Sequence, residues 1–328
     1  MVDLGGRSRK FIFVGLIVMN GILFSFYLIS TNENRLRSDY SSSLISKNYF
    51  SPQLSEIRPV QGQRAYMKSP SAEDESWRKV KVLCFVLTHP KALEKQTKYV
   101  KMSWGQRCDV TLYISDENNT SFPTIKVTKY KGYRMLWSKT RNTFKLAYEK
   151  FFDQVDWFLK TDDDTYVNVD NLRRFLAKKD TNSPMFYGKF FSPFVKGGYA
   201  SGGAGYVMGK AALTLLNEKA FKNTSACADE GVDTAEDVGM GKCMSYAGVT
   251  LARDAYDSQK RELFHSFPPE REYIIPWKKI GFYRQFSINR LGGDACCSQD
   301  VISYHYVKGP TMLFVDYLFQ NFTKTSLE

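Results

Sequence analysis

The chain has 328 residues, of which 43% are hydrophobic, and its 46 Lys and Arg against 34 Asp and Glu give a formal net charge of +12. The basic residues are spread along the whole chain and form no recognisable nucleic-acid module, which argues against a nucleic-acid partner. A solvated basic surface that attracts anionic ligands is the better interpretation of this charge.

The N-terminus has the pattern of a membrane anchor. Basic residues in the tail, residues 1–10, precede the span 11–30, which carries no formal charge. A span of this length can cross a bilayer as a helix. A cleaved signal peptide is the alternative, but it has a shorter apolar core and a small-residue cleavage site. The charge before the span predicts a cytosolic N-terminus and a lumenal or external remainder, a single-pass topology.

Residues 31–76 are polar, with no sustained apolar period, and predict a flexible stem. Residues 77–328 are enough for one large domain with a substantial core. Buried strands are expected at Val80–Leu87 and Val110–Ile114, and a helix with one apolar face at Ser138–Phe152. This alternation predicts an α/β fold with a mostly parallel sheet flanked by helices.

A predicted strand at Val155–Lys160 runs into three consecutive carboxylates, Asp162, Asp163 and Asp164. In open α/β sheets, ligands bind beyond the carboxyl ends of strands. Three like charges repel unless a cation joins them, and Mg²⁺ or Mn²⁺ takes such oxygen ligands while it clamps a diphosphate. The pattern therefore favours a nucleotide-dependent enzyme. The alternative is a solvated acidic turn, and Asp170 is expected to cap the helix that follows.

Glycines are dense in Tyr199–Tyr206, where Gly202, Gly203 and Gly205 leave the backbone unusually free. They allow a sugar or phosphate to approach closely, or they form a turn into the strand that begins at Tyr206; both interpretations stay open. The chain lacks a Walker-type phosphate loop, which argues against a nucleotide-hydrolysing motor.

Two further segments carry candidate catalytic groups. Glu236 and Asp237 begin a predicted helix after Thr234, where acids ordinarily pair with the helix dipole below a Thr cap. The functional alternative makes Asp237 a general base. His305 lies in the alternating segment Val301–Val307, either as a packed strand histidine or as a partner of the carboxylates around Mn²⁺, which accepts mixed nitrogen and oxygen ligands.

Six cysteines lie beyond the predicted span, and an even number in an oxidising compartment suggests disulfides. The spacing makes a Cys227 to Cys243 bond plausible, whereas the adjacent Cys296 and Cys297 can bond only through a strained ring. Zinc is disfavoured, because no Cys-x-x-Cys pair is present. Sequons for N-glycosylation stand at Asn118, Asn119, Asn223 and Asn321.

The chain from about Val80 to Phe322 resembles the metal-dependent β1,3-glycosyltransferases of the Golgi, in particular the core 1 β1,3-galactosyltransferase group. The motifs that carry the resemblance are Ser103–Cys108, Leu136–Thr140, Trp157–Val167, Tyr199–Tyr206, Glu236–Asp237, Cys296–Cys297 and Tyr304–Val307. The resemblance implies a GT-A fold with a Rossmann-like sheet. It also implies inverting transfer of galactose from UDP-galactose to O3 of GalNAc on Ser or Thr of glycoproteins.

The same resemblance implies roles for individual residues. Asp162, Asp164 and His305 would bind Mn²⁺, and Asp237 would deprotonate the acceptor hydroxyl. Residues on the donor side would be Asp162 and Asp163 near ribose or sugar, Trp104, Arg107, Lys139, Gly202 and Gly203. The family also implies a Golgi membrane protein with a lumenal catalytic domain, and a homodimer.

One segment departs from the family pattern. The stretch before the cysteine pair is usually dense in Trp, Tyr and Asn, but residues 280–288 have fewer aromatic faces on which a sugar can stack. A related β1,3-transferase with another acceptor or donor is therefore an alternative. A second alternative is a non-catalytic chaperone of the endoplasmic reticulum, but such a relative lacks the intact acidic motif that this chain has.

Overall fold

The computed structural model describes residues 75–275, 279, 281–288 and 296–321. The chain divides into two compact units, Met1–Ser69 and Pro70–Glu328, and all described residues belong to the second. The predicted tail, the membrane anchor and all but the last two residues of the predicted stem lie outside the described residues. None of the described helices has the length and apolar character needed to cross a membrane.

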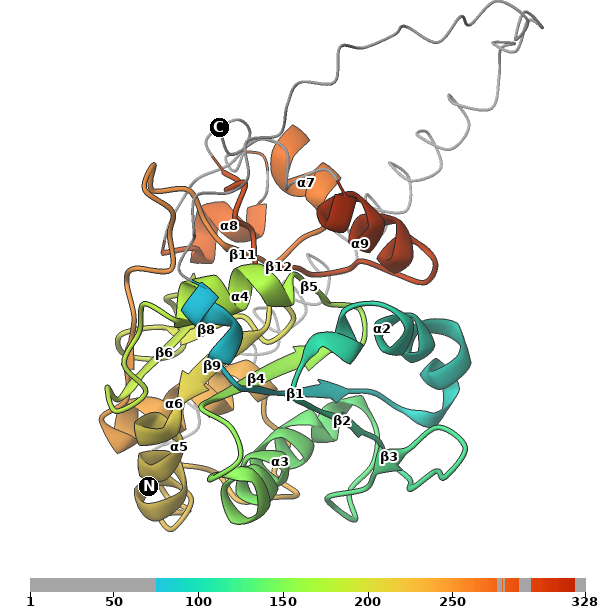
Figure 1. The fold of residues 1–328 in the computed structure, drawn as a ribbon. Helices are drawn as coiled ribbons and strands as arrows, with labels where there is room; N and C mark the ends of the chain where they lie inside the picture. Colours follow the sequence, from blue (N-terminus) through green and yellow to red (C-terminus); the bar gives the residue numbers. More distant parts are fainter. Residues whose placement is uncertain (1–74, 276–278, 280, 289–295, 322–328) are drawn as a thin grey trace, which may run out of the picture. The chain divides into compact units, whose positions relative to one another are not determined.

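A central sheet organises the described part of the chain, which places seven strands side by side (Figure 1). In spatial order they are β10 (Thr250–Leu251), β6 (Met185–Gly188), β9 (Tyr206–Gly209), β4 (Trp157–Asp162), β1 (Val82–Leu87), β2 (Val110–Ile114) and β3 (Thr124–Ile125). Strands β4, β1, β2 and β3 run parallel, whereas β9 is antiparallel to β4 and β6. The predicted mostly parallel sheet is confirmed.

Both faces of this sheet are covered, because alternate residues of β1 enter two different cores. Leu83, Phe85 and Leu87 belong to the core beneath α3 (Leu136–Phe151), α5 (Lys210–Leu215) and α6 (Glu236–Ala247). Val82, Cys84 and Val86 belong to the core beneath α2 (Lys98–Met102), α4 (Val169–Leu176) and α9 (Thr311–Asn321). Figure 1 shows these two helical layers on opposite sides of the sheet.

A smaller sheet joins the C-terminal part of the chain to the end of the main sheet. Its strands are β11 (Phe264–His265), β12 (Ser303–Tyr304) and β5 (Tyr166–Val167), in that order, and a hairpin of β7 (Phe190–Phe191) and β8 (Tyr199–Ala200) stands apart. The short helices α7 (Pro269–Ile274) and α8 (Gly281–Phe286) follow β11. Because β12 pairs with β5, the segment after Tyr304 lies against the acidic turn, where Val307 N donates to Asp164 O at 2.9 Å.

Local structure differs from the sequence expectations at two helix starts. Asp170 does not cap α4; Asn168 does, since its side chain accepts from Asn171 N. Thr234 does not cap α6, whose N-cap position is held by Ala235. In both cases the acid lies in the first helical turn, where its charge meets the positive end of the helix dipole.

Two strand boundaries also differ. Strand β4 extends to Asp162, because its ladder with β1 continues to the pair Leu87 and Asp162. Regular strand in the predicted segment Val301–Val307 is confined to Ser303–Tyr304. The strand ends there because the backbone of Tyr306 enters the left-handed region, with a φ of 59°.

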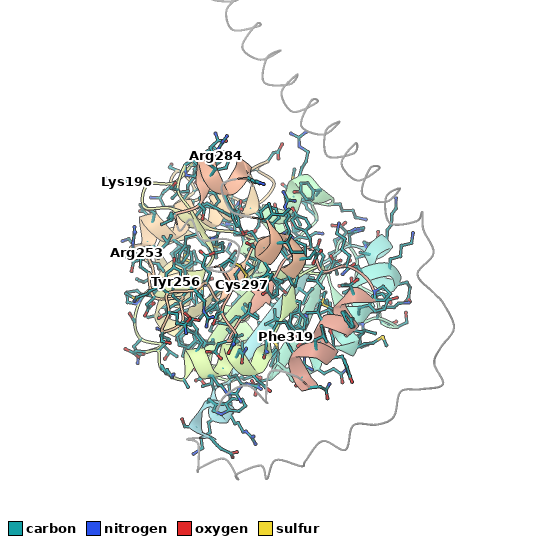
Figure 2. All side chains as sticks on the ribbon, turned by 90° about the horizontal axis from the view of Figure 1, so that it is seen from above. Lys196, Arg253, Tyr256, Arg284, Cys297 and Phe319 are labelled. Carbon is teal, nitrogen blue, oxygen red and sulfur yellow. A yellow bond between two sulfur atoms is a disulfide. The ribbon has the colours of Figure 1, made fainter. Side chains whose placement is uncertain are left out.

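All six cysteines lie in the described part of the chain and form disulfides. Cys84 of β1 is bonded to Cys108, and the expected bond between Cys227 and Cys243 is present. The adjacent Cys296 and Cys297 are bonded to each other. Exposed basic side chains include Lys196, Arg253 and Arg284, which are labelled in Figure 2.

Candidate active site

The acidic motif lies where the parallel strands end. Asp162 is the last residue of β4, and Asp163 N donates to Leu87 O at the end of β1 at 3.1 Å. The turn that follows returns at once, because Thr165 Oγ1 accepts from Asp162 N at 3.1 Å. The carboxylates therefore stand at the edge of the sheet where α/β folds bind ligands.

Asp162, Asp164 and His305 are brought together in this structure, although His305 is far away in the sequence. One ligand atom from each of the three side chains lies within 4.8 Å of the others. His305 Nε2 is 3.1 Å from Asp164 Oδ1, and both side chains are partly accessible. Two carboxylates and an imidazole form a donor set that suits Mn²⁺ and similar divalent cations. We call these three residues the metal cluster.

Gly203 packs directly against the imidazole of the metal cluster. A Cβ on Gly203 would overlap the ring atoms of His305. The carbonyl of Gly203 accepts from Thr165 Oγ1 at 2.8 Å, which fixes the loop to the acidic turn. Gly202 has an equivalent constraint, because a Cβ there would press on Glu236 Oε2 and Lys160 Nζ. The glycines are thus required by side chains of the site itself.

Asp237 lies at the start of α6, next to Gly202. Its Oδ1 accepts from Val238 N at 2.8 Å, and the side chain is partly exposed. Burial raises the pKa of Asp237 above its ordinary value, and hydrogen bonds from the backbone of Val238 and Gly202 offset part of that rise. A partly exposed carboxylate with a raised pKa has the properties of a general base.

Lys160 belongs to the candidate site, and sequence reasoning missed it. It is buried in β4, and its Nζ contacts Asp162 Oδ1 at 2.7 Å, Glu236 Oε2 at 3.2 Å and Gly202 O at 3.1 Å. Burial alone lowers the pKa of Lys160, but the two carboxylates outweigh it and raise the pKa. For Asp162, burial is likewise outweighed by Lys160 and His305, which hold its pKa below the ordinary value. A lysine directly after the apolar run Trp157–Leu159 of a buried strand was the available signal.

Asp163 points away from the metal cluster. Its Oδ2 accepts from Thr88 Oγ1 at 2.7 Å and from Thr97 Oγ1 at 3.2 Å, while its carbonyl accepts from Gln96 Nε2. Burial raises the pKa of Asp163 to about 6. In this structure the residue holds the acidic turn against the segment around Gln96. Its predicted proximity to a ribose or sugar stays a prediction.

Among the other predicted donor-side residues, Trp104 and Lys139 are buried and Arg107 is partly exposed. Trp104 is fully buried, and its Nε1 donates to Thr165 O at 3.0 Å, so it supports the acidic turn from within the core. Arg107 pairs with Asp316 of α9. Lys139 is buried, with its Nζ 2.7 Å from Asp116 Oδ1 and 3.0 Å from Thr88 O. Each of these residues has a partner within the protein, and their predicted place on the donor side stays a prediction.

Tyr306 is a second residue that the sequence did not single out. It follows His305, and the two rings stack with centroids 3.7 Å apart. Tyr306 is 46% exposed, beside the partly accessible metal cluster. A non-glycine residue with positive φ is strained, at a cost of about 1 kcal/mol or more. The structure tolerates this strain while presenting an aromatic face next to the metal cluster.

Comparison with known proteins agrees with this geometry. Residues 79–274, more than half of the chain, match the protein family described as Fringe-like. The glycoprotein-N-acetylgalactosamine 3-beta-galactosyltransferase 1 of Xenopus laevis is 36% identical over 302 residues, which cover 90% of this chain and 81% of the relative. The chain belongs to the Fringe-like glycosyltransferase family. The family resemblance stated from the motifs is confirmed.

Two further relatives are less similar to this chain. The beta-1,3-glucosyltransferase of Mus musculus is 24% identical over 65% of this chain and 42% of the relative. The chondroitin sulfate synthase 3 of Homo sapiens is 27% identical over 37% of this chain and 14% of the relative. These relatives are named for different sugars and acceptors, so the family by itself leaves the substrate to be argued.

Proposed function

We propose that this Fringe-like glycosyltransferase transfers galactose from UDP-galactose to O3 of GalNAc linked to Ser or Thr, with inversion, and that its domain is of the GT-A type. The similarity to the Xenopus laevis galactosyltransferase extends over most of both chains, which supports this donor and acceptor. The structure contributes an acidic metal cluster and a separate carboxylate on α6. In this proposal the cation stabilises the departing diphosphate and the carboxylate activates the acceptor hydroxyl.

Asp162, Asp164 and His305 would hold the cation, for which Mn²⁺ is the proposed identity. Their donor atoms are mutually close, and the missing side chain of Gly203 gives the imidazole its place. A bound divalent cation supplies positive charge that stabilises a departing diphosphate. The protein's part is to orient the ligands: Asp164 O accepts from Val307 N, and His305 N donates to His265 O at 3.1 Å.

Asp237 acts as the general base in this proposal. Its carboxylate takes the proton of the acceptor O3 hydroxyl while that oxygen forms a bond to C1 of galactose. The bond between C1 and the UDP oxygen breaks, and its electron pair leaves with UDP. A positioned base of this kind contributes about 10²- to 10⁴-fold in rate.

The proposal rests on the position of the Gly202–Gly203 loop. Gly203 abuts His305 of the metal cluster, and a Cβ on the adjacent Gly202 would lie 3.5 Å from Asp237 Cβ. One short loop therefore contacts both the proposed metal site and the proposed base. This arrangement gives the base and the donor-binding metal a fixed mutual position, as a direct displacement requires.

Two alternative functions make different demands on the metal cluster and on Asp237. A transferase specific for another sugar nucleotide would use the same metal and base, and only substrate comparison separates it from a galactosyltransferase. A non-catalytic chaperone would need neither group. The close contacts of Asp162, Asp164 and His305, together with the raised pKa of Asp237 caused by burial, favour an enzyme.

The cellular setting is part of the proposal. The apolar segment 11–30 with basic residues before it supports a type II anchor in the Golgi membrane, with the catalytic domain in the lumen. Three disulfides in the described domain suit such an oxidising compartment. A homodimer is proposed from the family resemblance. Epitope accessibility in selectively permeabilised cells tests the topology, and light scattering of the purified protein tests the dimer.

The decisive experiment measures Mn²⁺-dependent galactose transfer from UDP-galactose to a GalNAcα-Ser/Thr peptide by the purified full-length chain. We expect robust transfer by the wild type. Asp164→Ala should abolish transfer, because it removes a metal ligand, and Asp237→Asn should lower kcat by at least about 100-fold, because it removes the base. Asp153→Ala, which changes an exposed acid after α3, should behave as wild type.

The same assay includes UDP-glucose and UDP-N-acetylglucosamine as donors. Preference for one of these donors would contradict the galactosyltransferase proposal but would still show that the protein is a glycosyltransferase. Failure of the folded wild type with every donor and acceptor would contradict the enzyme and favour the chaperone.

A further inference from the structure

Lys160 lies at the junction of the three segments that form the candidate site. It is 1% exposed, and three apolar core residues, Trp157–Leu159, precede it in β4. Its ammonium contacts the end of β4 through Asp162, the glycine loop through Gly202 O, and the first turn of α6 through Glu236. A buried lysine with contacts to three separate segments fixes their relative positions.

The charges around this lysine are unequal. One ammonium faces the two carboxylates of Asp162 and Glu236, and Glu236 is held in place on its other side by Tyr206 OH, which donates to Oε1 at 2.7 Å. Asp162 is also a member of the metal cluster. The ammonium at Oδ1 and a cation at the metal cluster would therefore compete for the charge of one carboxylate.

We propose that Lys160 is a positioning residue that weakens cation binding at the metal cluster while it fixes the base helix. This inference rests on the proposed function for the identity of the cation. The ammonium 2.7 Å from Asp162 Oδ1 reduces the attraction of that carboxylate for a second cation. The weaker cation binding is offset by the placement of the base. The same ammonium contacts Glu236 and so holds α6, which carries Asp237.

Two parameters should change in opposite directions when Lys160 is removed. In Lys160→Met, loss of a positive charge beside the metal cluster should tighten binding of Mn²⁺ alone by about tenfold. The same substitution should lower kcat, because α6 loses its contact with β4. A residue with a merely structural role would weaken both. The dissociation constant for Mn²⁺ is measured by electron paramagnetic resonance of free Mn²⁺ with the full-length chain.

Three further variants separate charge from position. Lys160→Arg keeps the charge in a larger group, so Mn²⁺ affinity should match wild type while kcat falls. Glu236→Gln leaves Lys160 with one carboxylate partner, so Mn²⁺ binding should weaken. Lys160→Met combined with Glu236→Gln removes one buried carboxylate together with the ammonium, so this variant should fold better than Lys160→Met and still bind Mn²⁺ more tightly than wild type.

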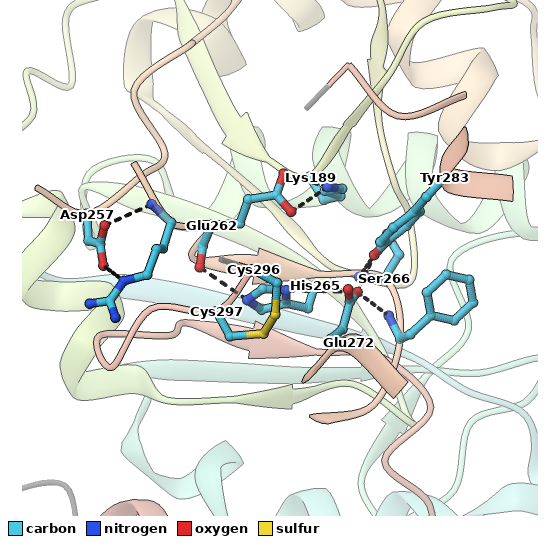
Figure 3. Close-up of a disulfide and its surroundings, with 11 residues drawn as sticks. Lys189, Asp257, Glu262, His265, Ser266, Glu272, Tyr283, Cys296 and Cys297 are labelled. Carbon is cyan, nitrogen blue, oxygen red and sulfur yellow. Dashed lines mark hydrogen bonds and ion pairs between the residues drawn. A yellow bond between two sulfur atoms is a disulfide. The ribbon is translucent and has the colours of Figure 1, made fainter. Parts of the chain in front are cut away.

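Lys189→Met is the matched control. Lys189 is also buried and pairs with Glu262, outside the metal cluster (Figure 3). Its loss should lower the melting temperature without a change in Mn²⁺ affinity. The proposal is overturned if folded Lys160→Met and the double variant bind Mn²⁺ no more tightly than wild type. Because this readout needs no sugar substrate, failure of galactose transfer would leave it intact, and the two proposals can fail separately.

Discussion

Gly203 shows how one missing side chain shapes the candidate active site. Its backbone approaches the ring of His305 so closely that a Cβ would overlap the imidazole. Gly203→Ala should therefore displace His305 from Asp164, which it now contacts at 3.1 Å. We expect Mn²⁺ affinity to fall at least about tenfold, since the loss of one orienting contact in a metal site typically costs 10- to 100-fold. Mn²⁺ titration of the purified variant measures this loss.

Gly281→Ala provides the comparison for Gly203→Ala. Gly281 begins α8, and a Cβ there would meet no atom within 4 Å among the described residues. Alanine also favours helix more than glycine does, so this variant should retain Mn²⁺ affinity and melt at the same temperature or slightly higher. Equal Mn²⁺ affinity of Gly203→Ala and wild type would contradict the predicted role of the close approach.

Helix α6 carries both Asp237 and Glu236, and a disulfide anchors its middle. Cys243 on the helix is bonded to Cys227, 16 residues earlier. Replacing both cysteines by serine should destabilise the fold by about 3 kcal/mol, because the unfolded chain loses a closed loop. We also expect kcat to fall, since Asp237 then sits on a less constrained helix. Chemical denaturation gives the stability change, and steady-state kinetics gives kcat.

The disulfide between Cys84 and Cys108 serves as the control for the disulfide that anchors α6. It joins β1 to the segment before β2 and closes a loop of similar length. Its removal should cost a comparable free energy of unfolding, but Mn²⁺ affinity and kcat per folded molecule should be retained. If both pairs changed kcat equally, the effect would be one of general stability rather than of the position of α6.

The stability of the whole domain should depend on pH through a buried carboxyl group on α7. Glu272 is 1% exposed, accepts from Phe267 N at 3.1 Å and from Tyr283 OH, and lies 3.8 Å from His265 (Figure 3). Burial raises the pKa of Glu272 from 4.5 to about 7. Between these values the folded state binds more protons than the unfolded state, so stability falls as pH rises.

Glu272→Gln should remove this dependence. Relative to wild type, the variant should gain up to about 3 kcal/mol in unfolding free energy between pH 5 and pH 8, from the roughly 2.5-unit rise in pKa. Burial lowers the pKa of His265 to about 3, which adds an opposing loss of stability as pH falls, so the difference between variant and wild type isolates Glu272. Denaturation at several pH values measures it.

Glu270→Gln serves as the control for this pH series. Glu270 lies on the same helix, α7, but is exposed to solvent. Its replacement should leave the unfolding free energy close to that of wild type at every pH. A Glu272→Gln variant whose difference from wild type stays constant from pH 5 to pH 8 would rule out a buried carboxyl with a raised pKa.

The aromatic segment before the cysteine pair has a role that its sequence did not reveal. In that segment Tyr283 of α8 is fully buried and donates a hydrogen bond to Glu272, and the effect of the fewer aromatic residues on the acceptor stays a prediction. Tyr306, by contrast, is exposed beside His305. The backbone direction at each residue decides whether an aromatic ring is buried or exposed. The amino-acid composition of a segment does not give this direction.

Sequence by itself determined the sheet and the family. Apolar residues indicate β1, most of β2 and the first half of β4, because strands buried on both faces are largely hydrophobic. The three acids after β4 could be placed at the carboxyl edge for the same reason. The motifs determined the family because their residues lie in a specific order along the chain, which is a property of sequence alone.

Only the tertiary structure decided which of these residues meet. Pairing of β12 with β5 carries His305 to Asp164, and the glycine loop then lies between His305 and α6. The same packing buried Trp104 and Lys139, paired Arg107 with Asp316 and made Lys160 the junction of the site. Long-range pairing and side-chain direction arise from burial of the whole chain against itself, so no local pattern encodes them.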